Sequence, residues 1–224
     1  LLGRTPKDFD IATSARPEQV ERLFPGAVTV GKSFGVVRAR VRGLEYEVAT
    51  FRRDQAYRDG RHPDGIVFAD EQADARRRDF TVNALFLDPQ DGAVHDHVGG
   101  RADLERRLIR AVGKADDRFA EDHLRLLRAA RFASTLEFEL EPATAEAVRR
   151  NAAQLASVSA ERIQQEFTRI LLESPRPGDA VALLQSLGLL PVFLPEVSAL
   201  QGQAQPPQFH PEGDVWTHTL MMLN

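Results

Sequence analysis

The chain has 224 residues, of which 33 are acidic and 29 basic, giving a net charge of −4 at pH 7. This length and composition are typical of one large globular domain or two ordinary ones, each with a hydrophobic core. The sequence has no Cys and no run of 18 apolar residues, which excludes disulfide scaffolds, Cys-ligated zinc sites and thiol catalysis, and predicts a cytoplasmic protein without a membrane partner.

The first hundred residues predict a mixed region of strands and helices. Short runs rich in Val, Phe and Thr, separated by Gly and Pro, are typical of strands. We predict one helix at 17–24 and strands at 27–30, 34–41, 44–51 and 80–87. The polar segment 52–77 has little periodicity, and a loop of that length is expected to be functional.

Beyond residue 100 the apolar period becomes helical, with helices predicted at 102–108, 116–132, 142–155, 160–172 and 177–187. Segment 201–208, rich in Gln and Pro, predicts a linker. The chain opens without Met and ends inside a predicted helix, so we expect it to be part of a longer protein. The predicted fold class is α+β, an α+β head followed by a helical body.

Two groups of carboxylates are candidate metal ligands. In a strand, Asp8 and Asp10 point to one face, and hard oxygen ligands of this kind suit Mg²⁺. Glu45 and Glu47 share a face of the predicted strand 44–51, and two-metal phosphoryl transfer needs such a third carboxylate. A solvated turn and a wet acidic strand face are the alternative interpretations.

Two further segments carry candidate binding groups. Three consecutive Arg residues at 76–78 precede Asp79, and Arg side chains with Asn83 suit a polyphosphate or a sugar. On one helix, Glu121, Arg125 and Arg128 would lie on a single stripe with Asp122 beside them. A solvated charged face and a salt-bridged surface helix are the alternatives.

Read in order, seven segments resemble the class II tRNA nucleotidyltransferase and bacterial poly(A) polymerase family. They are 3–13, 48–52, 59–63, 77–84, 96–104, 121–125 and 159–163. Each motif alone is weak evidence for the family. The seven motifs in the same order are specific for it. Two departures stand out: Asp96-His97-Val98-Gly99-Gly100 replaces Asp-Pro-Phe-Gly-Gly, and the family's Gly-Gly-x-Val-Arg-Asp stretch would precede Leu1.

The resemblance implies a fold of four parts. These are a polymerase-β-like nucleotidyltransferase head with a mixed sheet over 1–100, nucleotide-recognising neck helices over 101–134, an RNA-binding helical body over 135–200, and a linker with the start of an HD-type domain over 201–224. Segment 52–77 becomes a mobile catalytic loop. His218 would be the first metal ligand of the HD-type domain.

The resemblance also implies roles for individual residues. Asp8 and Asp10 would bind two Mg²⁺ ions, with Glu47 as the third catalytic carboxylate and Glu45 as the alternative. The implied nucleotide-binding residues are Arg77, Arg78, Asp79, Asn83, Glu121, Asp122, Arg125 and Arg128. We predict that the RNA backbone is bound by Arg101, Arg106, Arg107 and Arg110, with a solvated helix face as the alternative.

The Asp122 and Arg125 side chains suit the edges of C and A. Both bases present an amino donor next to a ring-nitrogen acceptor, whereas U and G present a carbonyl next to an N–H. A carboxylate and a guanidinium therefore pair with C and A and are left unpaired by U and G. One Asp/Arg pair would select C and A without a nucleic-acid template.

The implied activity is template-independent addition of C and A to the tRNA 3′ end from CTP and ATP, with release of pyrophosphate. The same motifs also allow a CC-adding enzyme, an A-adding enzyme or a poly(A) polymerase. The segment Asp59–Pro63 favours an enzyme that adds A. From other classes, an RNA-binding module with an inactive head and a phosphohydrolase in the HD-type part remain alternatives.

Overall fold

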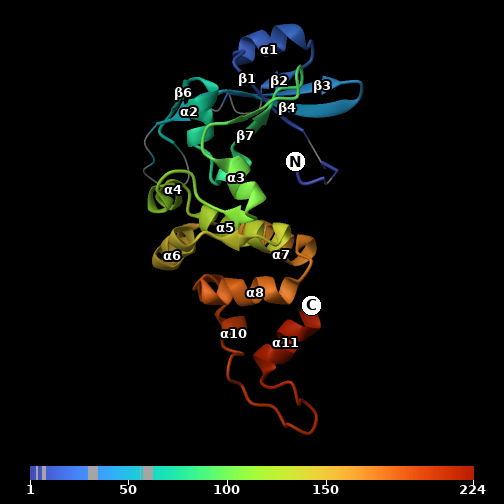
Figure 1. Cartoon of the computed structure of the whole chain (residues 1–224), viewed down its shortest axis with the longest axis vertical. Helices are drawn as coiled ribbons and strands as arrows, with labels where there is room; N and C mark the ends of the chain where they lie inside the picture. Colours follow the sequence, from blue (N-terminus) through green and yellow to red (C-terminus); the bar gives the residue numbers. More distant parts are fainter. Residues whose placement is uncertain (4, 7–8, 30–34, 56, 58–62) are drawn as a thin grey trace.

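The computed structural model describes the chain except for residues 4, 7–8, 30–34, 56 and 58–62. The molecule is elongated, with a sheet-containing head at one end and helices stacked towards the other (Figure 1). No helix among the described residues has the length and apolar character needed to cross a membrane. The predicted order of an α+β head and a helical body is confirmed.

The head is built on a mixed sheet with strand order β1-β4-β3-β2. Its elements are β1 (Asp10–Thr13), α1 (Pro17–Leu23), β2 (Val28–Thr29), β3 (Val36–Val41) and β4 (Leu44–Thr50). β1 runs parallel to β4, and the other pairs are antiparallel. Val20 of α1 packs with Val37, Ala39 and Val48, so alternate positions of the strands form a small separate core. Helix 17–24 and the strands 27–30, 34–41 and 44–51 are confirmed in type over the residues that the structure describes.

The rest of the head corrects two predictions. Segment 52–77 is not one loop, because it contains a hairpin and a helix. The strand predicted at 80–87 is wrong in its first half, where Phe80 is buried and a 3-10 turn follows, and only its end is a strand. The elements are β5 (Arg52–Asp54), β6 (Ile66–Phe68), α2 (Glu71–Arg76), η2 (Thr81–Asn83), β7 (Leu85–Leu87) and β8 (Val94–Asp96).

The neck corrects a third prediction, the continuous helix 116–132. The chain forms α3 (Gly100–Glu105), β9 (Leu108–Ile109), α4 (Ala115–Glu121), α5 (Leu124–Leu136) and β10 (Glu139–Leu140). Asp122 has extended backbone angles, φ −144° and ψ 108°, and its carboxylate accepts a hydrogen bond from the Leu124 N–H at 3.1 Å. Asp side chains compete with the helix in this way, so the break falls at Asp122.

The body surrounds the main hydrophobic core. Its elements are α6 (Pro142–Asn151), η3 (Ala152–Ser157), α7 (Ala160–Glu173), α8 (Pro177–Ser186), α9 (Leu190–Phe193), α10 (Pro195–Ser198) and α11 (Val215–Leu223). Leu126 and Leu127 of α5 are fully buried in one cluster with Ile170 of α7 and Leu184 of α8. Phe80 belongs to the same cluster, so the core continues from the body into the base of the head.

Candidate active site

Asp10 lies next to Glu47 in the head sheet. The parallel pairing of β1 and β4 sets these two residues in register, and partners in a ladder share a face of the sheet. Both residues are exposed. Glu45 lies two residues before Glu47 in β4, opposite Arg40 of β3, and precedes the part of β4 that pairs with β1. The register therefore favours Glu47 over Glu45 as the partner of Asp10, whereas Asp8 falls outside the described residues.

Arg38 of β3 neutralises both glutamates. Its Nη2 lies 3.5 Å from Glu47 Oε1, and its Nε lies 4.0 Å from Glu45 Oε2. This shared partner confirms that Glu45 and Glu47 lie on one face. Exposed carboxylates on adjacent strands fit a hard divalent cation such as Mg²⁺, which takes oxygen ligands and keeps several waters.

A buried aspartate that sequence reasoning missed holds the predicted phosphate-binding arginines. Asp74 of α2 is 2% exposed. It lies 2.7 Å from Arg77 Nη2 and 3.2 Å from Arg78 Nη2, and it accepts a hydrogen bond from the Arg52 N–H. The helical spacing from Asp74 to Arg77 and Arg78, three and four residues, is the sequence signal that would have identified it.

The structure brings together Asp79, Asn83 and Arg128. Asp79 Oδ1 accepts hydrogen bonds from Asn83 Nδ2 at 3.1 Å and from the Phe80 N–H, and Arg128 Nη2 lies 2.6 Å from Oδ2. Burial opposes ionisation of Asp79, but the charge of Arg128 and these hydrogen bonds outweigh it and hold the pKa of the carboxyl below its ordinary value. Asp79 thus orients Arg128 and Asn83.

The break between α4 and α5 fixes Arg125. Its Nη1 donates to Glu121 Oε2 at 2.5 Å and to the Arg118 carbonyl at 3.0 Å, while Nη2 donates to the Arg77 carbonyl at 3.1 Å. Glu121 also binds Arg118. The predicted single stripe is wrong, because only Glu121 and Arg125 contact each other and Arg128 faces Asp79.

Asp122 is held from the body. Arg162 of α7 donates to both of its carboxylate oxygens, at 2.9 and 3.2 Å. Asp122 and Arg125 therefore flank the same turn, each braced by a different neighbour. Arg162 lies within segment 159–163 but was not identified as a site residue, because its partner is 40 positions away in the chain.

A cavity of about 430 Å³ opens beside the neck, within the range of small-molecule sites. Arg77 and Glu121 line it, together with Tyr57, Arg76 and Arg118. Burial and a hydrogen bond to Asp54 raise the pKa of Tyr57, so its hydroxyl stays protonated and donates to that carboxylate at 2.6 Å. The cavity thus presents charged groups of both signs and hydrogen-bonding groups, because Asp54, Asp70 and Glu121 line it beside the arginines.

A buried ionic network between α5 and α7 supports Arg128. Arg131 is 3% exposed, and its Nε donates to Glu166 Oε2 at 2.5 Å. Arg128 Nη1 lies 3.8 Å from the other oxygen of Glu166, and both guanidiniums lie over the Phe132 ring. Glu166 of α7 is therefore the common partner of two α5 arginines, one of which reaches Asp79 in the head.

We expect Glu166→Ala to lower the free energy of unfolding by about 3–5 kcal/mol, because it leaves the buried Arg131 charge uncompensated. Urea unfolding followed by circular dichroism measures this. Glu146→Ala, which removes the exposed partner of Arg149, serves as the control and should cost less than about 1 kcal/mol. Equal losses in the two variants would contradict the assignment of the network.

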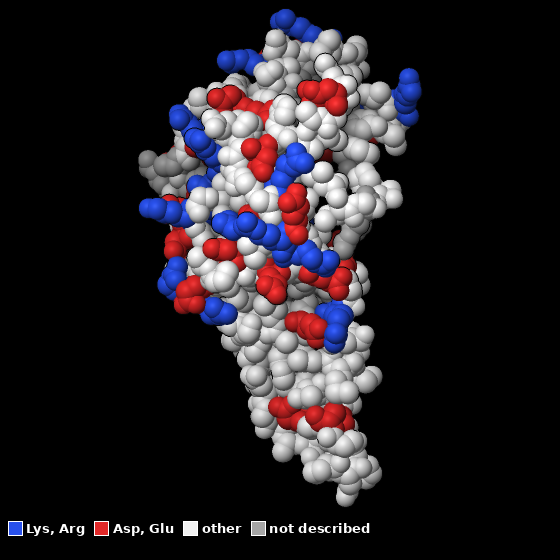
Figure 2. All heavy atoms as spheres, in the orientation of Figure 1, with Lys and Arg blue, Asp and Glu red and all other residues white. Residues whose placement is uncertain are grey.

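The four arginines predicted to bind RNA lie on α3 and the segment that follows it. Arg101 and Arg106 are exposed. Arg107 Nη2 donates to the Glu137 carbonyl at 3.2 Å, and Arg110 Nη2 lies 3.1 Å from Asp103 Oδ1. Charges of both signs are interspersed over the middle of the visible face, and few lie towards the α11 end (Figure 2). Arg107 is also exposed, whereas Arg110 is partly buried.

Comparison with known proteins matches the head and the helical body of this chain separately. The sequence profile described as Poly A polymerase head domain matches residues 1–110, and the profile described as Probable RNA and SrmB-binding site of polymerase A matches residues 137–200. The CCA-adding enzyme of Geobacillus kaustophilus is 45% identical over 89% of this chain and 49% of its own length. That of Lactobacillus johnsonii is 39% identical over all of this chain and 57% of its own.

Solved structures agree with these relatives. The CCA-adding enzyme of Bacillus stearothermophilus in complex with CTP is 40% identical, with a TM-score of 0.79 over 90% of this chain and 49% of that one. A tRNA nucleotidyltransferase complexed with a primer tRNA and an incoming ATP analog is 25% identical, with a TM-score of 0.70. The chain spans about half the length of the curated relatives it matches. It belongs to the class II tRNA nucleotidyltransferase and bacterial poly(A) polymerase family.

Proposed function

We propose that this chain is the transferase part of an enzyme that adds C and A to the 3′ end of tRNA from CTP and ATP. The observation that carries the proposal is the turn at Asp122, where Arg162 holds the carboxylate and Glu121 holds Arg125. A protein that selects nucleotides without a template needs such a fixed donor–acceptor pair. The proposal includes the cytoplasmic location expected from the sequence.

The relatives and structural neighbours support the substrates. Structures related to this chain are described as complexes with CTP, with an ATP analog and a primer tRNA, and with tRNA. We infer that the terminal ribose hydroxyl of the tRNA attacks the α-phosphate of the bound nucleotide. The bond to the β-phosphate oxygen breaks, and pyrophosphate leaves. The protein supplies positioning and electrostatic stabilisation, as in other phosphoryl transfers.

The head carboxylates fit a metal site. Asp8 and Asp10 would hold two Mg²⁺ ions, and Glu47, next to Asp10 in register, would supply the third carboxylate. Bound Mg²⁺ would lower the pKa of the attacking hydroxyl and neutralise charge on the phosphates. The Arg38 guanidinium contacts Glu45 and Glu47 on this face, so it offsets part of the repulsion between the two carboxylates.

The neck would hold the nucleotide. Asp122 would accept from the amino group of C or A, and Arg125 would donate to the adjacent ring nitrogen. Arg128 with Arg77 or Arg78 would bind the triphosphate, and Asp74 and Asp79 pre-organise these guanidiniums. Because the arginines already have fixed orientations, less side-chain entropy is lost when the phosphates bind.

We expect the double variant Arg101→Ala/Arg106→Ala to weaken tRNA binding and to flatten its salt dependence. Each lost phosphate contact lowers the slope of log K against log salt by about 0.7–0.9, so two contacts remove about 1.4–1.8. Filter binding between low and physiological salt measures the slope. Arg149→Ala, in an exposed ion pair on α6, is the control, and an unchanged slope in the double variant would contradict the proposed RNA contact.

An extension assay tests the function directly. Three tRNAs, ending before CCA, after C and after CC, each receive one labelled nucleotide with Mg²⁺, and the products are resolved on a sequencing gel. The assay uses this chain and a longer form extended upstream of Leu1. Addition of C to the first two RNAs and of A to the third supports the proposal. Addition of A only would indicate an A-adding enzyme, and an unlimited A ladder would indicate a poly(A) polymerase. If the longer form adds no nucleotide, the chain is an RNA-binding module.

A further inference from the structure

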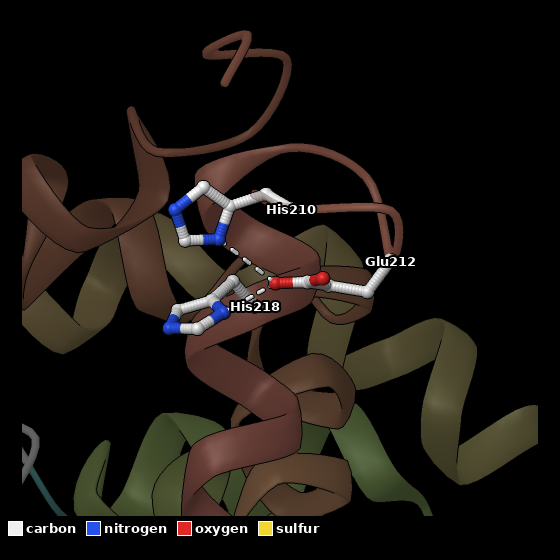
Figure 3. Close-up of side chains that lie close together, drawn as sticks. All are labelled: His210, Glu212 and His218. Atoms are coloured by element: carbon white, nitrogen blue, oxygen red, sulfur yellow. Dashed lines mark hydrogen bonds and ion pairs between the residues drawn. The ribbon is translucent and has the colours of Figure 1, made fainter. Parts of the chain in front are cut away.

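Two histidines and a glutamate converge at the end of the molecule opposite the head. His210 and Glu212 lie in the segment before α11, and His218 lies in its first turns (Figures 1 and 3). Among the residues that the structure describes, this is the only group of three potential metal-ligating side chains whose ligand atoms all lie within 4.8 Å of one another. These three residues take no part in the nucleotide transfer proposed for the head and neck.

Both histidines direct Nδ1 at the same carboxylate oxygen. His210 Nδ1 lies 3.1 Å from Glu212 Oε1, and His218 Nδ1 lies 2.5 Å from the same oxygen. The two imidazole rings meet edge to face, with centroids 5.0 Å apart. Both Nδ1 atoms point towards the carboxylate and both Nε2 atoms point away from it (Figure 3). Two nitrogens and one oxygen are thus already gathered on one side of the pair of rings.

The surrounding backbone fixes this arrangement. Gly213 has a φ of +128°, a conformation that a residue with a side chain rarely adopts, and it turns the chain between Glu212 and α11. Asp214 then caps the helix by accepting hydrogen bonds from the Thr217 N–H and hydroxyl, and its second oxygen accepts from the Gly202 N–H at 2.6 Å. These hydrogen bonds fix the start of α11, and so they fix the positions of Glu212 before the cap and of His218 after it.

Helix α11 is itself docked on the body, which keeps His218 in place. Trp216 is 7% exposed within the main core. Gly178 of α8 approaches α11 so closely that a Cβ there would lie 2.1 Å from the Leu220 carbonyl oxygen. Asn224 accepts a hydrogen bond from the Gly178 N–H at 2.8 Å. The cluster therefore rests on a packed helix and an anchored turn.

The donor set fits a transition metal better than Mg²⁺. Imidazole nitrogens with one carboxylate are ligands of Zn²⁺ and its neighbours, whereas Mg²⁺ takes oxygen ligands. With metal–ligand bonds of about 2.0–2.1 Å, a tetrahedral site separates its ligands by about 3.3 Å. The observed separations from Glu212 of 3.1 and 2.5 Å require only a small outward movement of the side chains.

We propose that His210, Glu212 and His218 bind one divalent transition metal of the zinc type. The three side chains are 30%, 17% and 38% exposed, so solvent reaches the fourth tetrahedral position and a water molecule fills it. The site lies wholly within nine residues of the chain and combines His218, singled out from the sequence, with two ligands that sequence reasoning did not identify. It is distinct in place and donor type from the carboxylates of the head.

Metal titration tests this site. The chelator-treated protein is titrated with Zn²⁺ against a chromophoric competitor in excess Mg²⁺, which occupies oxygen-only sites. We expect one Zn²⁺ per chain. Glu212→Gln and His218→Gln should each weaken binding by more than about 100-fold, because even partners behind a ligand contribute 10- to 100-fold to affinity. Replacing Zn²⁺ with Co²⁺ should give the visible absorption of a tetrahedral site in the wild type and not in the variants.

Two controls separate this site from other histidines and from misfolding. The double variant His95→Gln/His97→Gln removes the pair that contacts Glu71 in the head and should bind Zn²⁺ as the wild type does. Glu212→Gln keeps a side chain of the same shape that still accepts hydrogen bonds, and an unchanged circular dichroism spectrum confirms its fold. Wild-type affinity in Glu212→Gln and His218→Gln, loss of the Zn²⁺ in the His95/His97 variant, or no stoichiometric binding at all would each overturn the proposal.

Discussion

Replacing Asp10 with Asn is expected to lower the rate of nucleotide addition by at least about 10³-fold while leaving the fold intact. The side chain is exposed at the start of β1, so the substitution removes charge without opening a cavity. The loss follows because electrostatic stabilisation of the transferring phosphoryl group is among the largest contributions to this chemistry. Single-turnover extension of a tRNA ending in CC measures the rate.

The two glutamates of β4 provide a matched comparison. Both contact Arg38 and are similarly exposed, at 59% for Glu45 and 58% for Glu47, but only Glu47 is in register with Asp10. We expect Glu47→Gln to slow addition by about 10²–10³-fold and Glu45→Gln to retain most of the rate. The reverse order would assign the third carboxylate to Glu45, and full activity in Asp10→Asn would contradict a metal role for this face.

Replacing Asp122 with Asn is expected to admit U and G as well as C and A. The carboxylate only accepts hydrogen bonds, and thus opposes the carbonyl oxygens of U and G; an amide also donates and can pair with them. With the wild type we expect about 10⁴-fold discrimination by kcat/KM, because unpaired polar groups in a site cost several kcal/mol. In the variant we expect this ratio to fall below about 10².

Competition between CTP and UTP on a tRNA ending after its first C measures this ratio. Asp116→Asn is the control, since it alters an exposed α4 carboxylate that contacts Arg150 and Asn151. Its discrimination should match that of the wild type. A variant at Asp122 that loses rate equally for all four nucleotides would show that this residue supports the turn without reading the base.

The order of elements and the carboxylate pattern could be predicted from the sequence because they depend on local spacing. Alternating residues in β4 place Glu45 and Glu47 on one face, and the apolar period of α7 and α8 identifies them as helices. The family resemblance rests on motifs in the same order as the structural elements, and the matches at 1–110 and 137–200 confirm it.

What local spacing did not predict depends on contacts between distant parts of the chain. The register of β1 with β4 selects Glu47, and no local pattern states which strands will pair. The helix break at Asp122 was missed because the helical period continues through it, while the bonds to Leu124 and Arg162 decide the local backbone. The convergence of His210 and Glu212 on His218 likewise depends on the turn at Gly213.

We propose that this protein chooses C and A without a template and stops after them. The most direct measurement is mass spectrometry of the 3′ end of a tRNA lacking CCA after incubation with all four nucleotides, Mg²⁺ and the form extended upstream of Leu1. We expect one product, longer by C, C and A in that order, and no product from the Asp10→Asn variant of the same form. Incorporation of U or G, a continuing A ladder, or no addition by the unmodified form would contradict it.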